Sequence, residues 1–277
     1  MELDGRMTAA APGLDELLLL ARDTALAAGA LALQRRRDGV EVAATKSSPV
    51  DIVTQADRDA EELIRGLLAK ARPDDGFLGE ESGAEPGTSG LTWVVDPIDG
   101  TVNFLYGIPA WAVSIAVVEG DPDPRTWRAL AGAVVNPTNE EFYTASAGGG
   151  AHLGNGVLRV GAGVPLDRAL IGTGFSYRLE PREEQIDVAG EVLRRSRDLR
   201  RIGSAALDLC SVAAGRLDAY YEWGLNPWDQ AAGALIAAEA GARVVGEGDA
   251  PASSDLLVAG PAALVDELLP VITAFRH

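Results

Sequence analysis

The chain has 277 residues, of which 47% are hydrophobic, and carries a formal net charge of −17. This length and composition allow one large domain or two closely joined ones, with disorder expected at the ends alone. The negative charge disfavours nucleic acid as a main partner, because phosphate backbones need a basic face. No apolar run approaches the roughly 18 residues that cross a bilayer. The acidic start also lacks the basic region of a secretory signal, so we expect a cytoplasmic protein.

The first half of the chain begins with two predicted helices. Leu and Ala recur at helical spacing over residues 13–37, which end in arginines that suit a helix C-terminus. Residues 38–54 are predicted to form a loop, and Thr54 can cap a second helix over residues 55–71. Strand-like runs follow at 77–78, 92–96, 111–119, 128–136 and 140–144, with short strands and Gly turns to about residue 160.

The second half alternates strands with helices. Strands are predicted at 169–173, 217–222, 243–245 and 255–259, and helices at 182–196, 204–214, 228–240 and 261–273. The composition shifts near residue 150, which suggests an N-terminal α+β half (1–150) and a C-terminal α/β half (151–277) in one compact unit. The pattern predicts an α/β fold with helices layered against sheets.

The composition restricts the ligands that a metal site could use. Cys210 is the single cysteine, so the chain has no internal disulfide and no thiolate zinc site. His152 and His277 are the two histidines, which disfavours a His-based triad or a His-rich metal site. Any metal must therefore be held by oxygen, which suits hard ions such as Mg²⁺.

Two carboxylates end an apolar run in the stretch WVVDPIDGTVNF, where Asp96 and Asp99 flank Pro97. Open α/β sheets bind ligands beyond the carboxyl ends of their strands, and Pro97 favours an extended Asp96. Gly100 and Thr101 can begin a helix whose free N–H groups favour an anion. Two such close carboxylates repel unless a cation lies between them. A turn with capping aspartates would explain either Asp, but not both together with the Gly–Thr pair.

Three further stretches place charged residues at predicted element ends. GEES carries Glu80 after an apolar pair, and WDQAAG places Asp229 at the start of an Ala-rich helix. TKSSPVDIVTQAD runs from Lys46 to Asp57. Taken alone, each has a simpler interpretation: a solvated Glu pair, an Asp favoured by the helix dipole, and a solvated loop.

Together these four stretches resemble the inositol monophosphatase family of Mg²⁺-dependent, lithium-sensitive phosphatases, roughly from Lys46 to Ala242. The stretch RRIGSAALDLC…GRLDAYYEWG looks like the inositol-1-phosphatase branch found in actinobacteria. The resemblance implies an αβαβα sandwich, commonly a homodimer. It also implies hydrolysis of inositol 1-phosphate, a small-molecule phosphate ester, by a metal-activated water.

The resemblance further implies roles for individual residues. The groups that would hold two to three Mg²⁺ ions are Glu80, Asp96, the carbonyl of Ile98, Asp99 and Asp229. The groups that would bind substrate are Asp99, Gly100, Thr101, Ser204, Ala205, Glu222 and Asp229. Glu80 and Thr101 would orient the attacking water, with Asp57 supporting Thr101, and Lys46 would belong to a mobile loop near the metals.

Two patterns point instead to other phosphatase chemistries. CSVAAGR, from Cys210 to Arg216, matches the Cys-x5-Arg pattern of cysteine phosphatases, which need a low-pKa thiolate in a phosphate-binding loop. The segment continues an apolar helical pattern, so we interpret Cys210 as a core residue. DPIDGT is similar to the DxDGT of haloacid-dehalogenase-type phosphatases, but Asp96 and Asp99 are three residues apart rather than two.

Within the family, the substrate has several candidates. GLNPWD, with Pro227 before Asp229, is similar to the histidinol-phosphate branch, whereas Trp228 and AYYE favour inositol. Fructose 1,6-bisphosphate is a candidate side activity, and a 3′-phosphoadenosine substrate is disfavoured because no basic cluster or insertion is present. A non-catalytic regulatory member is a different class of hypothesis, and the intact acidic positions with Thr101 argue against it.

Overall fold

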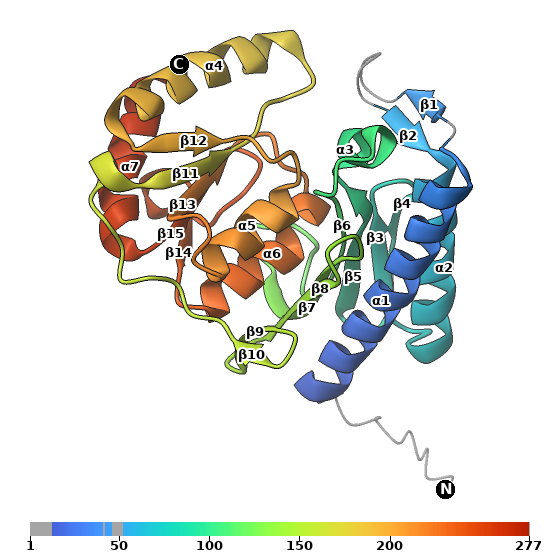
Figure 1. Cartoon of the computed structure of the whole chain (residues 1–277). Helices are drawn as coiled ribbons and strands as arrows, with labels where there is room; N and C mark the ends of the chain where they lie inside the picture. Colours follow the sequence, from blue (N-terminus) through green and yellow to red (C-terminus); the bar gives the residue numbers. More distant parts are fainter. Residues whose placement is uncertain (1–12, 41, 46–51, 277) are drawn as a thin grey trace, which may run out of the picture.

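Figure 1 shows the computed structural model of the chain, which describes residues 13–40, 42–45 and 52–276. The helices are α1 (Leu14–Asp38), α2 (Gln55–Ala71), α3 (Thr101–Tyr106), α4 (Leu179–Arg195), α5 (Ala205–Ala213), α6 (Pro227–Glu239) and α7 (Ala262–Ala274). The strands of the first half are β1 (Val42–Thr45), β2 (Ile52–Thr54), β3 (Gly76–Gly79), β4 (Gly83–Glu85), β5 (Leu91–Asp99), β6 (Ala112–Glu119), β7 (Arg128–Asn136), β8 (Glu141–Ser146), β9 (Gly150–Leu153) and β10 (Gly156–Val157). Those of the second half are β11 (Leu170–Thr173), β12 (Asp198–Arg200), β13 (Ala219–Glu222), β14 (Arg243–Val245) and β15 (Leu257–Gly260).

The strands form two large sheets and one small hairpin. The first sheet has eight strands in the order β10-β9-β8-β7-β6-β5-β3-β4, and its pairs are antiparallel except for the parallel pair β3–β5. The second has five strands in the order β12-β11-β13-β15-β14, with β11 parallel to both of its neighbours. β1 and β2 form a separate antiparallel pair. The first sheet continues through Val157, past residue 150, and the division into two domains stays a prediction.

The helices and sheets alternate in five layers. α1 and α2 cover one face of the first sheet, α5 and α6 lie between the two sheets, and α4 and α7 cover the far face of the second sheet (Figure 1). This order confirms the αβαβα sandwich that the sequence motifs implied.

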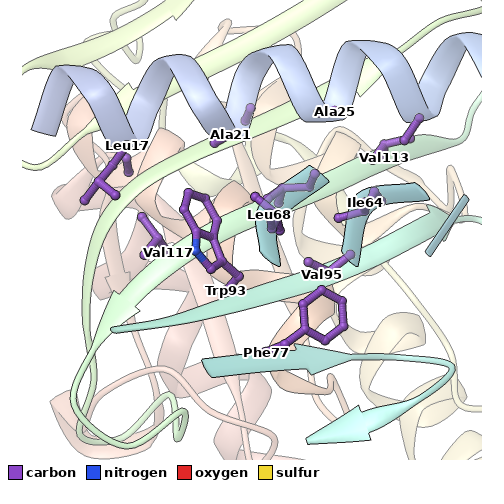
Figure 2. Packing of buried hydrophobic residues seen from close by; sticks show 14 of the residues in the cluster. Leu17, Ala21, Ala25, Ile64, Leu68, Phe77, Trp93, Val95, Val113 and Val117 are labelled. Carbon is purple, nitrogen blue, oxygen red and sulfur yellow. The ribbon is translucent and has the colours of Figure 1, made fainter. Parts of the chain in front are cut away.

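Strand β5 shows why the central layers form. Trp93 and Val95 point into the core beneath α1 and α2, where Figure 2 shows them beside Leu17 and Ile64. Val94 points to the opposite face and packs in the cluster formed with α5 and α6. Because successive side chains of a strand alternate between faces, a run that is apolar at every position suits a sheet buried on both sides.

Most predicted elements are confirmed, and the differences have local causes. Residues 38–54 are not a plain loop, since they include β1 and β2, and α4 begins at Leu179 because Pro181 is tolerated in a first helical turn. β5 does not stop at Asp96 but runs to Asp99. Its pairing with β6 is irregular between Asp96 and Asp99, so the missing N–H of Pro97 costs no regular ladder bond there.

Two further expectations concern the Lys46 loop and membrane-spanning helices. Lys46 and its loop lie outside the described residues. Within the described part of the chain, no helix combines the length and apolarity that crossing a bilayer requires.

Candidate active site

A cavity of about 760 Å³ is lined by residues from both halves of the chain. Its lining includes the end of β5, the start of α3, the starts of α5 and α6, and the end of β13. The predicted site residues that line it are Glu80, Asp96, Ile98, Asp99, Gly100, Thr101, Ser204, Ala205, Glu222 and Asp229. Groups from distant parts of the sequence thus share one cavity.

Four acidic side chains form one wall of this cavity. Asp96 and Asp99 come from the end of β5, Glu80 follows β3, and Asp229 belongs to the first turn of α6. Burial, followed by the charges of Glu80, Asp99 and Asp229, raises the pKa of Asp96 well above its usual range. Burial, followed by Asp99 and Glu80, also raises the pKa of Asp229. The wall therefore brings several acidic groups together in a buried place.

Asp99 combines burial with good hydrogen bonds. Its Oδ2 accepts hydrogen bonds from the Ser204 hydroxyl at 2.6 Å and from the Ala206 N–H at 2.7 Å. These donors lower its pKa, but burial has the larger effect and raises it to about 6. The two bonds attach the start of α5 to the end of β5, so this carboxyl group joins the central helix layer to the first sheet.

The donor set fits a hard divalent cation. In this conformation, no group of three or more His, Cys, Asp and Glu side chains among the described residues is arranged to hold a metal ion. The acidic wall nevertheless offers carboxylate oxygens, which Mg²⁺ prefers. Repulsion among these buried acids is relieved when a cation binds between them, so the site chemically suits such an ion.

Gly100 and Thr101 line the cavity beside the acids. Gly100 precedes α3 in the left-handed region, with φ 97°, and a Cβ there would lie 3.0 Å from the Ala110 carbonyl oxygen. Both the conformation and the space therefore require glycine. The Thr101 hydroxyl lies 3.2 Å from Asp57 Oδ1 and from the Ile98 carbonyl oxygen.

Asp57 lies behind the cavity at the start of α2. Its Oδ2 accepts the Thr54 N–H at 2.8 Å, and together with the Thr54 side chain it completes a capping box. The structure thus brings Asp57 to Thr101, while its supporting role in catalysis stays a prediction.

Glu222 ends β13 and lines the same cavity as the acids of β5. The Tyr220 hydroxyl donates a hydrogen bond to Glu222 Oε2 at 2.6 Å, and burial raises the pKa of Glu222 to about 7. A Cβ on Gly174 would lie 1.9 Å from this same oxygen, so the glycine leaves the space that the carboxyl group occupies. The arrangement offers an oriented acceptor for a hydroxyl group.

The structure adds cavity residues that the sequence motifs did not indicate. Asp208 is 1% exposed, and its Oδ1 has no hydrogen-bond partner within the described structure. A single charged residue inside the apolar run AALDLC was the signal that could have revealed it. Arg178, Arg201 and Arg276 also line the cavity. Arg201 belongs to the stretch RRIGSAALDLC, but the sequence analysis assigned no role to any of the three.

Cys210 is confirmed as a core residue. It is 0% exposed within α5, and burial raises the pKa of its thiol well above the usual range. A cysteine phosphatase needs the opposite: an accessible, low-pKa thiolate in a phosphate-binding loop.

The layered fold, with an acidic cavity beside the start of a helix, defines a phosphatase of the α/β sandwich type. The sequence profile described as "Inositol monophosphatase family" matches residues 13–272. The chain therefore belongs to the inositol monophosphatase family, whose phosphatases depend on metal ions.

Relatives and solved structures agree with this membership. The inositol-1-monophosphatase SuhB of Mycobacterium tuberculosis (H37Rv) is 48% identical over 254 residues, which covers 88% of this chain and 86% of the relative. The solved M. tuberculosis SuhB structure superposes with a TM-score of 0.79 at 45% identity, covering 96% of this chain and 99% of that one. The extragenic suppressor protein suhB of Bartonella henselae gives a TM-score of 0.83 at 36% identity, with 92% and 97% covered.

A relative that carries a different name is also similar. The Nus factor SuhB of Pseudomonas aeruginosa (PAO1) is 44% identical over 204 residues, covering 70% of this chain and 72% of the relative.

Proposed function

We propose that this phosphatase hydrolyses inositol 1-phosphate to myo-inositol and phosphate, with two to three Mg²⁺ ions in its active site. The observation that carries the proposal is the joining in one cavity of four acidic side chains, the start of α3 and Glu222. The name of the M. tuberculosis relative supports the substrate.

The acidic wall is the proposed metal site. The groups that would hold the ions are Glu80, Asp96, the carbonyl of Ile98, Asp99 and Asp229. When bound, divalent ions lower the pKa of a water molecule and neutralise phosphate oxygens as Lewis acids. Asp96 would be shared between ions, because it lies buried among the other three acids.

Residues beside the acidic wall would position the reactants. The hydrogen bond from the Thr101 hydroxyl to Asp57 leaves the Thr101 oxygen able to accept a hydrogen bond from the attacking water. Glu80 would hold the same water from the other side, and the N–H groups of Gly100 and Thr101 would bind the phosphate. A phosphorylated protein side chain is not required.

The groups proposed to bind the inositol ring are Ser204, Ala205 and Glu222. Glu222 would accept a hydrogen bond from a ring hydroxyl, since Tyr220 already orients its carboxyl group. A hydroxyl-recognising acceptor of this kind distinguishes a polyol phosphate from a simple phosphate ester.

A panel of phosphate esters tests the proposed function. Inositol 1-phosphate, histidinol phosphate and fructose 1,6-bisphosphate are assayed with and without Mg²⁺ and with added lithium. We expect phosphate release to be fastest from inositol 1-phosphate, to require Mg²⁺ and to be inhibited by lithium. Faster release from histidinol phosphate would transfer the assignment to that alternative, and no release from any ester would refute an enzymatic function.

The Glu80→Gln variant tests the position of the attacking water. It should lose most turnover while retaining the circular dichroism spectrum of the wild type. Wild-type turnover in this variant would contradict the proposed role of Glu80.

We also propose that the protein forms a homodimer in the cytoplasm. The exposed apolar residues Leu179, Ile186 and Leu193 recur every seven residues on α4, which suits a contact with a second copy. Light scattering should give twice the mass of one chain, and Ile186→Glu should reduce this mass if α4 forms the contact.

A gel-shift with RNA at physiological salt separates this enzyme from a regulatory, nucleic-acid-binding member of the family. We expect no shift.

A further inference from the structure

Helix α2 presents three charged side chains toward the active-site turn. Asp57, Glu61 and Arg65 are spaced four residues apart, so they lie along one face of the helix. Asp57 contacts Thr101, Glu61 contacts the backbone of Glu81, and Arg65 contacts the Ser82 hydroxyl. The face thus contacts both the start of α3 and the GEES turn that carries Glu80.

Two successive backbone N–H groups, those of Glu80 and Glu81, donate hydrogen bonds at the turn. The Glu80 N–H donates to the Val95 carbonyl oxygen of β5 at 3.2 Å. The next N–H, that of Glu81, donates to Glu61 Oε2 at 2.9 Å. The first bond attaches the turn to β5, the strand that carries Asp96, and the second attaches the turn to α2. Together they fix the peptide groups on both sides of Glu80, whose side chain contacts Asp96.

The glycine of the GEES motif leaves room for Glu61. A Cβ on Gly79 would lie 2.5 Å from Glu61 Oε2 and 2.6 Å from its Cδ. It would also lie 2.6 Å from the Phe77 ring, so no L-residue with a side chain fits there unless the carboxyl group and this ring both move away. Gly79 therefore serves the approach of Glu61 to the turn.

The burial of Glu61 suggests that its carboxyl group has a specific role. Glu61 is 3% exposed, and its neighbours on the same side of α2, Ala60 and Ile64, are apolar and buried. A buried polar group costs stability unless it is hydrogen-bonded, so packing alone would favour an apolar residue here. The bond to the Glu81 N–H is the interaction that the acid supplies.

We propose that Glu61 is a positioning residue that holds the Glu80 turn in its ion-binding geometry through the Glu81 N–H. The inference rests on the proposed function, because it takes Glu80 as a metal ligand. It assigns Glu61 no contact with substrate or with the reacting atoms. Its effect is on the affinity of the site for divalent ions, through the orientation of a ligand.

Calorimetric titration of the full-length protein with Mg²⁺, in the absence of substrate, tests the inference. Glu61→Met keeps the length of the side chain and removes the acceptor. We expect it to weaken Mg²⁺ binding by about tenfold or more, while the melting temperature of the metal-free protein stays the same or rises. The matched control is Glu62→Met on the exposed neighbour, which should bind Mg²⁺ like the wild type.

A second variant decides the matter if Glu61→Met does not fold. Gly79→Ala places a methyl group where the Glu61 carboxyl lies, and should weaken Mg²⁺ binding in the same direction. Unchanged Mg²⁺ affinity in a folded Glu61→Met or Gly79→Ala variant would overturn the inference. Absence of Mg²⁺ binding by the wild type would instead refute the proposed function.

Discussion

Two groups of acidic side chains in this protein have opposite electrostatic surroundings: the partly exposed Glu141 and the buried acids of the cavity. On the outer part of the first sheet, Glu141 pairs with Arg216 at 2.5 Å, and this guanidinium lowers the pKa of the carboxyl. In the cavity, Asp96 is surrounded by other acids, which raise its pKa together with burial. The comparison shows that the pKa of a carboxyl group is lowered where the chain supplies a guanidinium, and raised where burial and other acids surround the group. The proposed metal ions would supply positive charge to the cavity acids.

The largest expected effect comes from removing one charge of the acidic wall. Asp96→Asn should reduce phosphate release more than about a hundredfold. Loss of a proposed metal ligand should cost more activity than loss of a residue that only supports a ligand. The same change should stabilise the metal-free protein, because a neutral amide of equal size removes repulsion. Phosphate release and thermal melting in EDTA measure the two effects, with the exposed Asp187→Asn as control. A loss of both activity and stability would place Asp96 with the structural acids instead.

A smaller effect is expected at the wall that carries Glu222. Gly174→Ala should displace the Glu222 carboxyl, because the added methyl overlaps its Oε2. We expect KM for inositol 1-phosphate to rise about tenfold, as expected for the loss of one hydrogen bond to a charged group. Hydrolysis of para-nitrophenyl phosphate, which lacks the polyol, should change little. An equal loss on both esters would mean that Gly174 supports the whole cavity rather than the recognition of hydroxyls.

The pH dependence of stability should differ between the two regions. In the cavity, burial raises the folded-state pKa values of Asp99 to about 6 and of Glu222 to about 7, above unfolded values of about 4. The folded state then binds more protons than the unfolded state between about pH 4 and 7, so the stability of the metal-free protein should fall as pH rises through this window. Urea unfolding in EDTA should show a loss of at least about 1 kcal/mol, which saturating Mg²⁺ reverses. Constant stability across the window would contradict the raised pKa values.

The smallest effect is expected at the paired acid. Arg216→Met should cost about 0.5 kcal/mol near neutral pH, since the pair is partly exposed to solvent. The folded pKa of Glu141 is lowered, so this contribution is present above its unfolded pKa of about 4.3 and is lost as pH falls through the folded value. Urea unfolding at neutral and acidic pH should therefore show the difference from wild type shrinking in acid. A difference that is constant with pH would assign the loss to the hydrogen bond that Arg216 donates to the Tyr143 hydroxyl.

The sequence predicted the parts of the site that depend on local order. Glu80, Asp96 and Asp99 follow or end apolar strands, and Asp229 begins a helix, so pattern and motif sufficed to propose them together. Asp208 and Glu61 could not be assigned a partner in this way. Their environments arise when α5 and α2 pack against strands that are distant in sequence.

The elements that the sequence missed are those with little local signal. β4 and β12 are three residues long, and their existence depends on pairing with β3 and β11. The passage of β5 through Pro97 was missed because the irregular pairing with β6 is not encoded near the proline itself. Long helices such as α1 and α2 were predictable because their own residues carry the periodicity.

The close approach of α6 to the first sheet has a consequence for how the protein is made. A Cβ on Gly132 of β7 would lie 3.1 Å from the Ala232 backbone, so Asp229 reaches the cavity on a helix seated tightly on strands formed by earlier residues. During synthesis, β5 and its acids leave the ribosome well before α6 is complete. A nascent chain thus carries an incomplete set of the proposed metal ligands until α6 docks on the first sheet.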